Sequence, residues 1–152
     1  MKEEQEILLV EDNSGDVELT LHALRGSDFG RRVHVVGDGE AALDFLFCRG
    51  PYSSRSFERP PKLVLLDLKL PKVDGLEVLR QIRTDPRTKT IPVVAFTSSQ
   101  AEGDVIEGYR LGINSYIYKP TDFEDFREMV KQAAQYWLQI NQPPPLAAFR
   151  GQ

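Results

Sequence analysis

The sequence predicts a doubly wound α/β fold, in which a five-stranded parallel sheet in the order 2-1-3-4-5 carries helices on both faces. Short apolar runs alternate with amphipathic stretches along most of the chain, which is the pattern of repeated βα units. Three of the runs are almost continuously apolar, as expected for parallel strands that helices cover on both sides. Five such units suit the order 2-1-3-4-5 best, and this order makes the first and third strands neighbours.

The strands are expected at the five apolar runs, which are residues 6–10 (EILLV), 33–36 (VHVV), 63–66 (LVLL), 92–96 (PVVAF) and 115–118 (SYIY). The helices are expected between and after them, at residues 15–25, 39–48, 75–84, 101–111 and 122–140. The last helix opens with Thr121-x-x-Glu124, the pattern of a capping box. Apolar residues then recur at helical spacing and predict a buried stripe formed by Phe123, Phe126, Val130, Ala133 and Trp137.

Two segments fall outside this alternation. Residues 49–61 are rich in Pro, Ser and Arg and lack periodicity, which predicts an extended surface loop before the third strand. Residues 141–152 contain three consecutive prolines, which end the last helix. We therefore expect one domain over residues 1–140, followed by a Pro-rich C-terminal tail over residues 141–152.

The composition is that of a globular protein and argues against several functional classes. The net charge is −4 and no basic stripe is visible, which argues against nucleic-acid binding. The single cysteine, Cys48, cannot form an internal disulfide, so we expect a reducing compartment. No apolar run approaches the roughly 20 residues that span a bilayer. We expect a cytoplasmic protein that binds neither nucleic acid nor membranes.

Charged and hydroxyl residues stand at the ends of four predicted strands. Glu11 and Asp12 follow the first strand and Asp67 follows the third. Thr97 follows the fourth strand and Lys119 follows the fifth. Because the carboxyl ends of parallel strands lie at one edge of the sheet, and ligands bind there, we expect these side chains to share one site.

Three carboxylates in one site repel one another, and a divalent cation would offset that repulsion. Mg²⁺ prefers oxygen ligands, retains several waters and binds through one or two carboxylates together with a phosphate. We expect Asp12 and Asp67 to be direct ligands and Glu11 to act through water. The backbone carbonyl of Lys69 is expected to supply another oxygen.

The same residues suit phosphoryl transfer. An ionised Asp67 beside a metal is placed to attack phosphorus and to become an aspartyl phosphate. Lys119 would bind one phosphoryl oxygen and Thr97 would donate a hydrogen bond to another. Each residue alone also has a bland explanation as a cap, a turn or a surface residue. Their coincidence at the ends of four strands favours a site.

The segments LLVEDN, LLDLKLPKVDG, VVAFTSS and SYIYKP resemble, in order and spacing, the signatures of receiver domains of two-component response regulators. The resemblance covers residues 5 to about 140. It implies a flavodoxin-like fold and Mg²⁺-dependent phosphorylation of Asp67. It also implies that the protein is no enzyme for an external substrate and catalyses only its own phosphorylation and dephosphorylation.

The resemblance also assigns switching roles. Thr97 and Lys119 match the hydroxyl and the lysine that sense phosphate in this family, and Tyr116 matches the aromatic residue that changes rotamer on activation. The bond between Lys119 and Pro120 is usually cis in the family. Lys69 stands where relatives commonly carry Asn, and we expect its side chain to overhang the phosphate and to alter the phosphate lifetime.

The long segment before the third strand and the ending YWLQINQPP look like the single-domain regulators of phytochrome-type histidine kinases. The resemblance implies such a kinase as phosphoryl donor and an output surface formed by the elements at 101–111, 115–118 and 122–140. We expect a homodimer through that surface. Its apolar residues are Tyr109, Phe123, Phe126, Tyr136, Trp137, Leu138 and Ile140.

Three other functions compete with this interpretation. A phosphatase of the haloacid dehalogenase type needs a second acid two residues after its nucleophile, where this chain has Lys69. A flavin-binding module needs a Ser/Thr/Gly-rich loop after the first strand, where this chain has Glu-Asp-Asn. A receiver-like interaction module that works without phosphate is the third alternative, and the acid, hydroxyl and lysine set argues against it.

Overall fold

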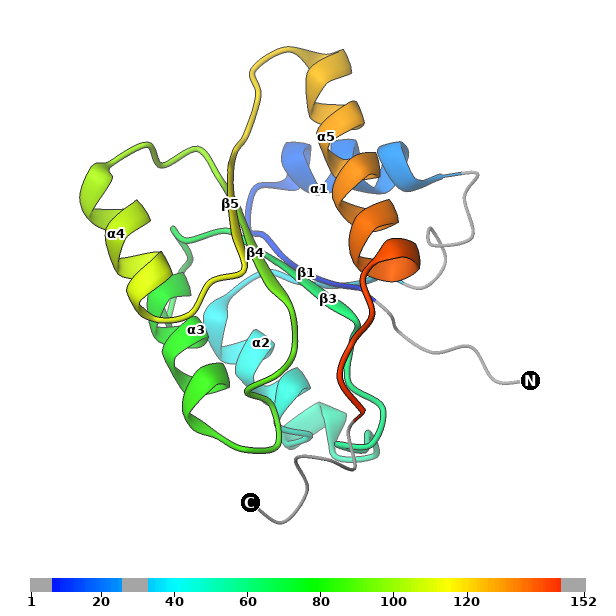
Figure 1. The fold of residues 1–152 in the computed structure, drawn as a ribbon, viewed down its shortest axis with the longest axis vertical. Helices are drawn as coiled ribbons and strands as arrows, with labels where there is room; N and C mark the ends of the chain where they lie inside the picture. The colour runs from blue at the N-terminus through cyan, green and yellow to red at the C-terminus, as the bar shows by residue number, and fades with distance from the viewer. Residues whose placement is uncertain (1–6, 26–32, 146–152) are drawn as a thin grey trace.

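A computed structural model describes residues 7–25 and 33–145, and these contain one parallel sheet in the order β2-β1-β3-β4-β5 (Figure 1). The strands are β1 (Ile7–Val10), β2 (Val33–Val36), β3 (Leu63–Leu66), β4 (Val93–Thr97) and β5 (Ser115–Tyr118). The predicted fold class and strand order are confirmed. β4 begins and ends one residue later than predicted, and the first residue of the run 6–10 lies outside the described residues.

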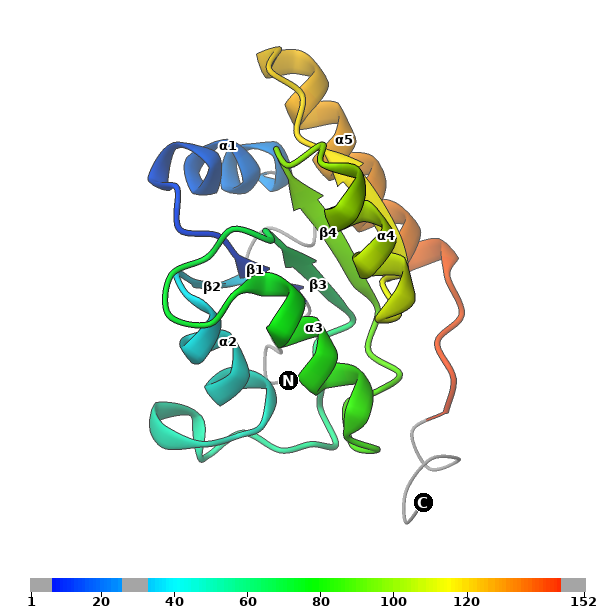
Figure 2. The same ribbon diagram turned by 90° about the vertical axis from the view of Figure 1, so that its left-hand side faces the viewer.

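In the described residues four α-helices connect the strands and a fifth follows β5: α1 (Ser14–Leu24), α2 (Gly39–Leu46), α3 (Gly75–Thr84), α4 (Glu102–Arg110) and α5 (Phe123–Gln135). α1 and α5 cover one face of the sheet, α2 and α3 cover the other, and α4 follows α3 toward the β5 edge (Figures 1 and 2). A π-helical turn over Tyr136–Ile140 extends α5 to the predicted end of the helix. Within the described parts of the chain, no helix combines the length and the hydropathy of a membrane span.

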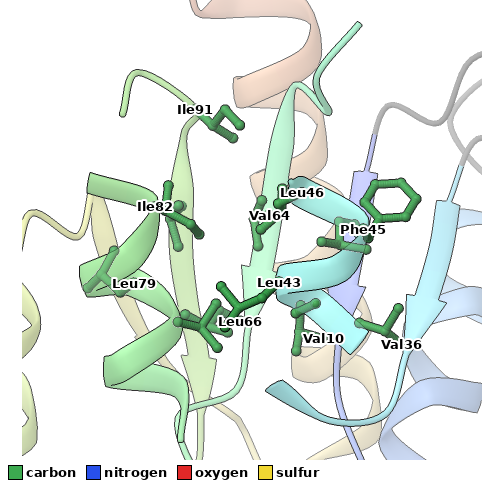
Figure 3. Close-up of a cluster of buried hydrophobic side chains, with 14 of the residues drawn as sticks. Val10, Val36, Leu43, Phe45, Leu46, Val64, Leu66, Leu79, Ile82 and Ile91 are labelled. Atoms are coloured by element: carbon green, nitrogen blue, oxygen red, sulfur yellow. The ribbon is translucent and has the colours of Figure 1, made fainter. Parts of the chain in front are cut away.

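The core has two layers because successive side chains of a strand point to opposite faces of the sheet. Figure 3 shows the larger layer, in which Val10, Val64 and Leu66 contact side chains of α2 and α3. The alternate residues of the same strands face α1 and α5, and these are Ile7, Leu9, Leu63 and Leu65. Strands buried on both faces explain why β1 and β3 are apolar throughout.

The start of α5 differs from the prediction. Asp122 is the N-cap, and its Oδ2 accepts a hydrogen bond from the backbone N of Asp125 at 3.0 Å, so the predicted capping box at Thr121 is wrong by one residue. The buried stripe of the helix is formed by Phe126, Val130 and Ala134. Phe123 is 47% exposed because it lies in the first turn of α5, outside the core layers. Its ring lies near that of His22, with ring centroids 6.1 Å apart.

The segment 49–61 lies mostly at the surface, as its composition predicts, but it is packed against α2 and is not extended. A short 3₁₀ helix over Gly50–Tyr52 opens it. The Tyr52 hydroxyl lies 3.1 Å from Nε2 of His34. The Arg55 guanidinium lies 3.8 Å from the ring centroid of Phe45 and also donates to the carbonyl of that residue. These contacts fold the segment back onto the sheet and α2.

Candidate functional site

The register of the sheet brings the acidic residues together. Val10 of β1 pairs with Leu66 of β3, so the next residues, Glu11 and Asp67, leave the sheet side by side. The backbone N of Asp67 donates to the carbonyl of Val10 at 3.0 Å and fixes this arrangement. Carboxylate oxygens of Glu11, Asp12 and Asp67 lie within 4.8 Å of one another. The predicted acidic cluster therefore exists in the folded chain.

This cluster fits a hard divalent cation. All of its donors are carboxylate oxygens, which Mg²⁺ and Mn²⁺ accept as ligands. Glu11 and Asp67 are buried, whereas Asp12 is exposed, so water can complete a coordination sphere. Lys69, whose carbonyl is the predicted further ligand, also lies beside the cluster. Its backbone N donates to Oδ1 of Asp67 at 3.3 Å.

Thr97 and Lys119 both contact the Asp67 carboxylate. Thr97 is fully buried, and its Oγ1 donates to Oδ1 of Asp67 at 2.7 Å. The Lys119 ammonium lies 3.0 Å from Oδ2 of Asp67, and its side chain is only 8% exposed. The pairing of β4 with β5 places these two residues side by side, and the backbone N of Lys119 donates to the carbonyl of Thr97 at 2.8 Å. The hydroxyl and the lysine predicted from strand ends therefore both contact the acid.

Asp16 belongs to the site and was missing from the prediction. The Lys119 ammonium lies 2.7 Å from both Oδ2 of Asp16 and Oε1 of Glu11. Asp16 lies in the first turn of α1, where an acid is ordinarily explained by the helix dipole. α1 begins directly after Glu11 and Asp12, with Asn13 as its N-cap. This closeness in sequence could have indicated that the first turn of the helix faces the site.

Burial and crowding alter the proton affinities of these groups. The pKa of Glu11 is raised from 4.5 to about 7, first by burial and then by the charge of Asp67, while Lys119 opposes the rise. Burial disfavours the charge on Lys119, but hydrogen bonds with Asp16 and Glu11 outweigh it and raise the pKa of the lysine above its usual range. Lys119 is therefore a permanent cation, whereas Glu11 exchanges a proton near neutral pH.

Three expectations for the surroundings can be compared with the structure. The half-buried Tyr116 turns its ring inward, and its hydroxyl donates to the carbonyl of Ser99 at 2.9 Å. Lys69 does not overhang Asp67, because its ammonium pairs with Oδ2 of Asp104 on α4 at 3.1 Å. The cis bond expected before Pro120 is not found either, since the described residues contain only trans peptides, the form that even prolines favour.

The sequence model of the response regulator receiver domain matches residues 7–131. Response regulator Rcp1 of Synechocystis sp. is 41% identical over 133 residues, which cover 88% of each chain. The probable methanogenesis regulatory protein FilR2 of Methanothrix harundinacea is 44% identical over 138 residues, which cover 91% of this chain and 86% of the relative. These matches span nearly the whole of the described sheet and its helices.

Two solved structures show the same architecture. The phosphorylated cyanobacterial phytochrome response regulator RcpA has a TM-score of 0.86 at 39% identity, and the match covers 93% of this chain and 99% of that one. The Mn²⁺-bound form of response regulator Rcp1 has a TM-score of 0.83 at 40% identity, with 91% and 98% covered. By its fold, its motifs and its relatives, this chain belongs to the response regulator receiver domain family and is similar to phytochrome response regulators.

Proposed function

We propose that this protein accepts a phosphoryl group from a sensor histidine kinase onto Asp67 in a Mg²⁺-dependent reaction. One observation carries the proposal: the Asp67 carboxylate contacts the Lys119 ammonium at 3.0 Å and the Thr97 hydroxyl at 2.7 Å, and it belongs to the acidic cluster with Glu11 and Asp12. This is the arrangement that phosphoryl transfer to a carboxylate requires, since it combines a nucleophile with positive charge and hydrogen-bond donors for the transferring group.

The reaction is a displacement at phosphorus. An oxygen of Asp67 attacks the phosphorus while the bond between phosphorus and the imidazole nitrogen of the donor breaks. The electron pair of that bond stays on the nitrogen. The donor leaves as neutral imidazole when its other ring nitrogen already carries a proton, and otherwise the leaving nitrogen takes a proton from solvent. Lys119 is placed to bind one phosphoryl oxygen, and the Thr97 hydroxyl can turn from the carboxylate to another.

Mg²⁺ is the proposed cofactor, with Asp12, Asp67 and the Lys69 carbonyl as direct ligands and Glu11 acting through water. The cation would neutralise charge on the carboxylates and on the phosphoryl oxygens. The oxygen-only cluster supports this choice. The Mn²⁺-bound form of Rcp1 supports it as well, because Mn²⁺ and Mg²⁺ accept the same hard ligands.

The test is phosphorylation of the full chain by acetyl phosphate with and without Mg²⁺, followed by intact mass. The parent should gain one phosphoryl group only when Mg²⁺ is present, and Asp67→Asn should gain none. Asp74→Asn is the matched control, because Asp74 follows the same strand but caps α3. A parent that gains no phosphoryl group would contradict the proposal and would favour an interaction module that works without phosphate.

We propose that output passes through Thr97 and Tyr116 to the surface of α4, β5 and α5. Thr97 moves toward the phosphoryl group, and Tyr116 takes up the space behind it, so phosphate favours one of two packings. Their geometry supports a coupled movement, since the β4–α4 loop contacts both residues. The backbone N of Ser99 donates to Oγ1 of Thr97 at 3.3 Å, and its carbonyl accepts from Tyr116.

A homodimer through the α4–β5–α5 surface is part of this proposal. The exposed large apolar residues of these elements and of the turn that extends α5 are Ile106, Tyr109, Tyr118, Phe123, Met129, Tyr136 and Ile140. Phe126, which was expected there, is buried in the core, and Trp137 and Leu138 pack against the core as well. An apolar surface of this kind is typical of protein–protein contacts.

Light scattering over a range of concentrations tests the dimer. The parent mass should rise with concentration, and Ile106→Lys should abolish the rise. Glu18→Lys on α1 is the control, since it adds the same charged side chain at an exposed position of another helix. A parent mass that stays monomeric at every concentration would exclude this part of the proposal.

The proposed donor is a phytochrome-type histidine kinase. The support is similarity: RcpA is a phytochrome response regulator, and the match extends over 93% of this chain. Phosphotransfer from a purified kinase of this class, compared with an unrelated sensor kinase under the same conditions, measures the preference. Equal transfer rates from both kinases would argue against a phytochrome-type partner.

A further inference from the structure

A closed ring of contacts surrounds the acceptor on the side of α4. Oδ1 of Asp67 accepts from Thr97, whose Oγ1 accepts from the backbone N of Ser99. Oγ of Ser99 donates to Oδ2 of Asp104, which also pairs with the Lys69 ammonium at 3.1 Å. The backbone N of Lys69 donates to Oδ1 of Asp67 at 3.3 Å and closes the ring. The acceptor and the first turn of α4 are thus connected by two routes.

The ion pair between Lys69 and Asp104 is the weakest point of this ring. The Lys69 side chain is 66% exposed and the Asp104 side chain is 19% exposed. Water screens such pairs, so an exposed ion pair changes an equilibrium by only about 1.4- to 5-fold. A new anion near Lys69 can therefore compete with Asp104 for the Lys69 ammonium.

A phosphoryl group on Asp67 is such an anion. It carries about two negative charges and three acceptor oxygens, in place of the single charge of the carboxylate. The Lys69 backbone already touches the carboxylate that would carry it. Lysine is also suited to exchange partners, because its ammonium is a point charge on a flexible stem.

We propose that Asp104 is a positioning residue that holds the Lys69 ammonium away from the acceptor, and that phosphorylation of Asp67 draws Lys69 from Asp104 to the phosphoryl group. The inference rests on the proposed function, since it requires phosphorylation at Asp67. Departure of Lys69 frees the first turn of α4 from the loop after β3. Ser99 follows, because its Oγ bonds Asp104 and its carbonyl accepts the Tyr116 hydroxyl.

The exchange also sets how long the phosphoryl group lasts. Hydrolysis requires a water that attacks the phosphorus in line with the leaving carboxylate oxygen. A lysine side chain that lies across the phosphoryl group covers the phosphorus from that water. Lys69 on the phosphoryl group lengthens the lifetime, and Asp104 shortens it by competing for the ammonium.

The experiment measures loss of the phosphoryl group after acetyl phosphate is removed, in the parent, Asp104→Asn, Lys69→Gln and the double variant. Asn at 104 keeps an oxygen for Ser99 and removes only the charge. Asp104→Asn should lengthen the lifetime by about 1.4- to 5-fold, the range of an exposed ion pair. Lys69→Gln should shorten it, and the double variant should match Lys69→Gln. Glu107→Gln, which removes an exposed acid paired with Arg110 on the same helix, should leave it unchanged.

Amide hydrogen exchange over residues 101–106 supplies a second measurement. Phosphorylation should raise exchange there in the parent, whereas unphosphorylated Asp104→Asn should already show the raised exchange. The proposal is overturned if Asp104→Asn has the parent lifetime, or if it lengthens the lifetime equally when Lys69 is replaced. Failure of the proposed function is distinguishable, because the parent would then never acquire a phosphoryl group.

Discussion

Replacing Lys119 with Met is expected to destabilise the metal-free protein at pH 8. The ammonium of Lys119 contacts the carboxylates of Asp16, Glu11 and Asp67 at 2.7, 2.7 and 3.0 Å. Met fills a similar volume with an apolar side chain, so the change removes the charge and its hydrogen bonds while preserving most of the packing. The acids then face one another without a cation.

The size of the loss follows from burial. Removing one partner of a buried ion pair costs about 3–5 kcal/mol. The loss is smaller here, because the Asp16 side chain is 27% exposed and can turn to water. Glu11 can also bind a proton, since its pKa is already raised to about 7. We therefore expect about 2–4 kcal/mol, or a fall in Tm of about 5–15 °C for a chain of this size.

Urea unfolding followed by circular dichroism in the presence of EDTA measures this free energy. Lys131→Met is the control, because Lys131 is an exposed lysine on α5. The loss should shrink at pH 5, where Glu11 is protonated, and Mg²⁺ should stabilise Lys119→Met more than it stabilises the parent. If Lys119→Met unfolds at the same urea concentration as the parent at pH 8, Lys119 does not hold these carboxylates.

Three further outcomes are expected. A Cβ at residue 39 would lie 1.9 Å from a backbone oxygen of the β3–α3 loop, so Gly39→Ala should lower the free energy of unfolding by about 1–3 kcal/mol. Gly103 has open space around it, so Gly103→Ala should raise the free energy of unfolding by about 0.4–1 kcal/mol. Thermal unfolding compares the two variants. Glu11 binds an extra proton in the folded state between pH 4.5 and about 7, so its contribution to metal-free stability is lost as the pH rises through 7. Mg²⁺ affinity should rise over the same window by up to about tenfold per pH unit, and calorimetry in two buffers should detect the released proton. Asp16→Asn should slow phosphorylation by acetyl phosphate about three- to tenfold, because Asp16 positions the Lys119 ammonium. It should change Mg²⁺ affinity little, because Asp16 is not one of the three clustered acids. Equal rates in a mass-spectrometric time course would exclude this role.

The sheet and most of the site could be predicted because both depend on strand sequence. Buried parallel strands read as continuous apolar runs, and the residue after each run lies at the carboxyl edge of the sheet. Glu11, Asp67 and Lys119 follow their strands directly, so their positions needed no knowledge of how the helices pack. Their mutual contacts in the structure agree with that reasoning.

The contacts made by helices could not be predicted in the same way. Asp16 and Asp104 each lie in the first turn of a helix, and which way they face depends on how α1 and α4 dock. Periodicity gave α5 an apolar stripe but not its phase, so Phe126 was assigned to the surface as well as the core, and Met129 was overlooked. The prediction placed the Lys69 side chain over Asp67 because the two residues are close in sequence. In the structure its ammonium pairs with Asp104, which belongs to another element, α4.

The alternation of β3 has a consequence for how variants of this gene should be interpreted. Asp67 reaches the site because the number of residues from Leu63 to Leu66 sets the side from which it leaves the strand. Losing or gaining one residue within that tetrapeptide would rotate the carboxylate by half a turn, toward the opposite layer of helices. On the proposed function, such an indel should abolish phosphorylation of Asp67 although every side chain of the site is still encoded. The spacing of the third strand is therefore as strict a marker of activity as the aspartate itself.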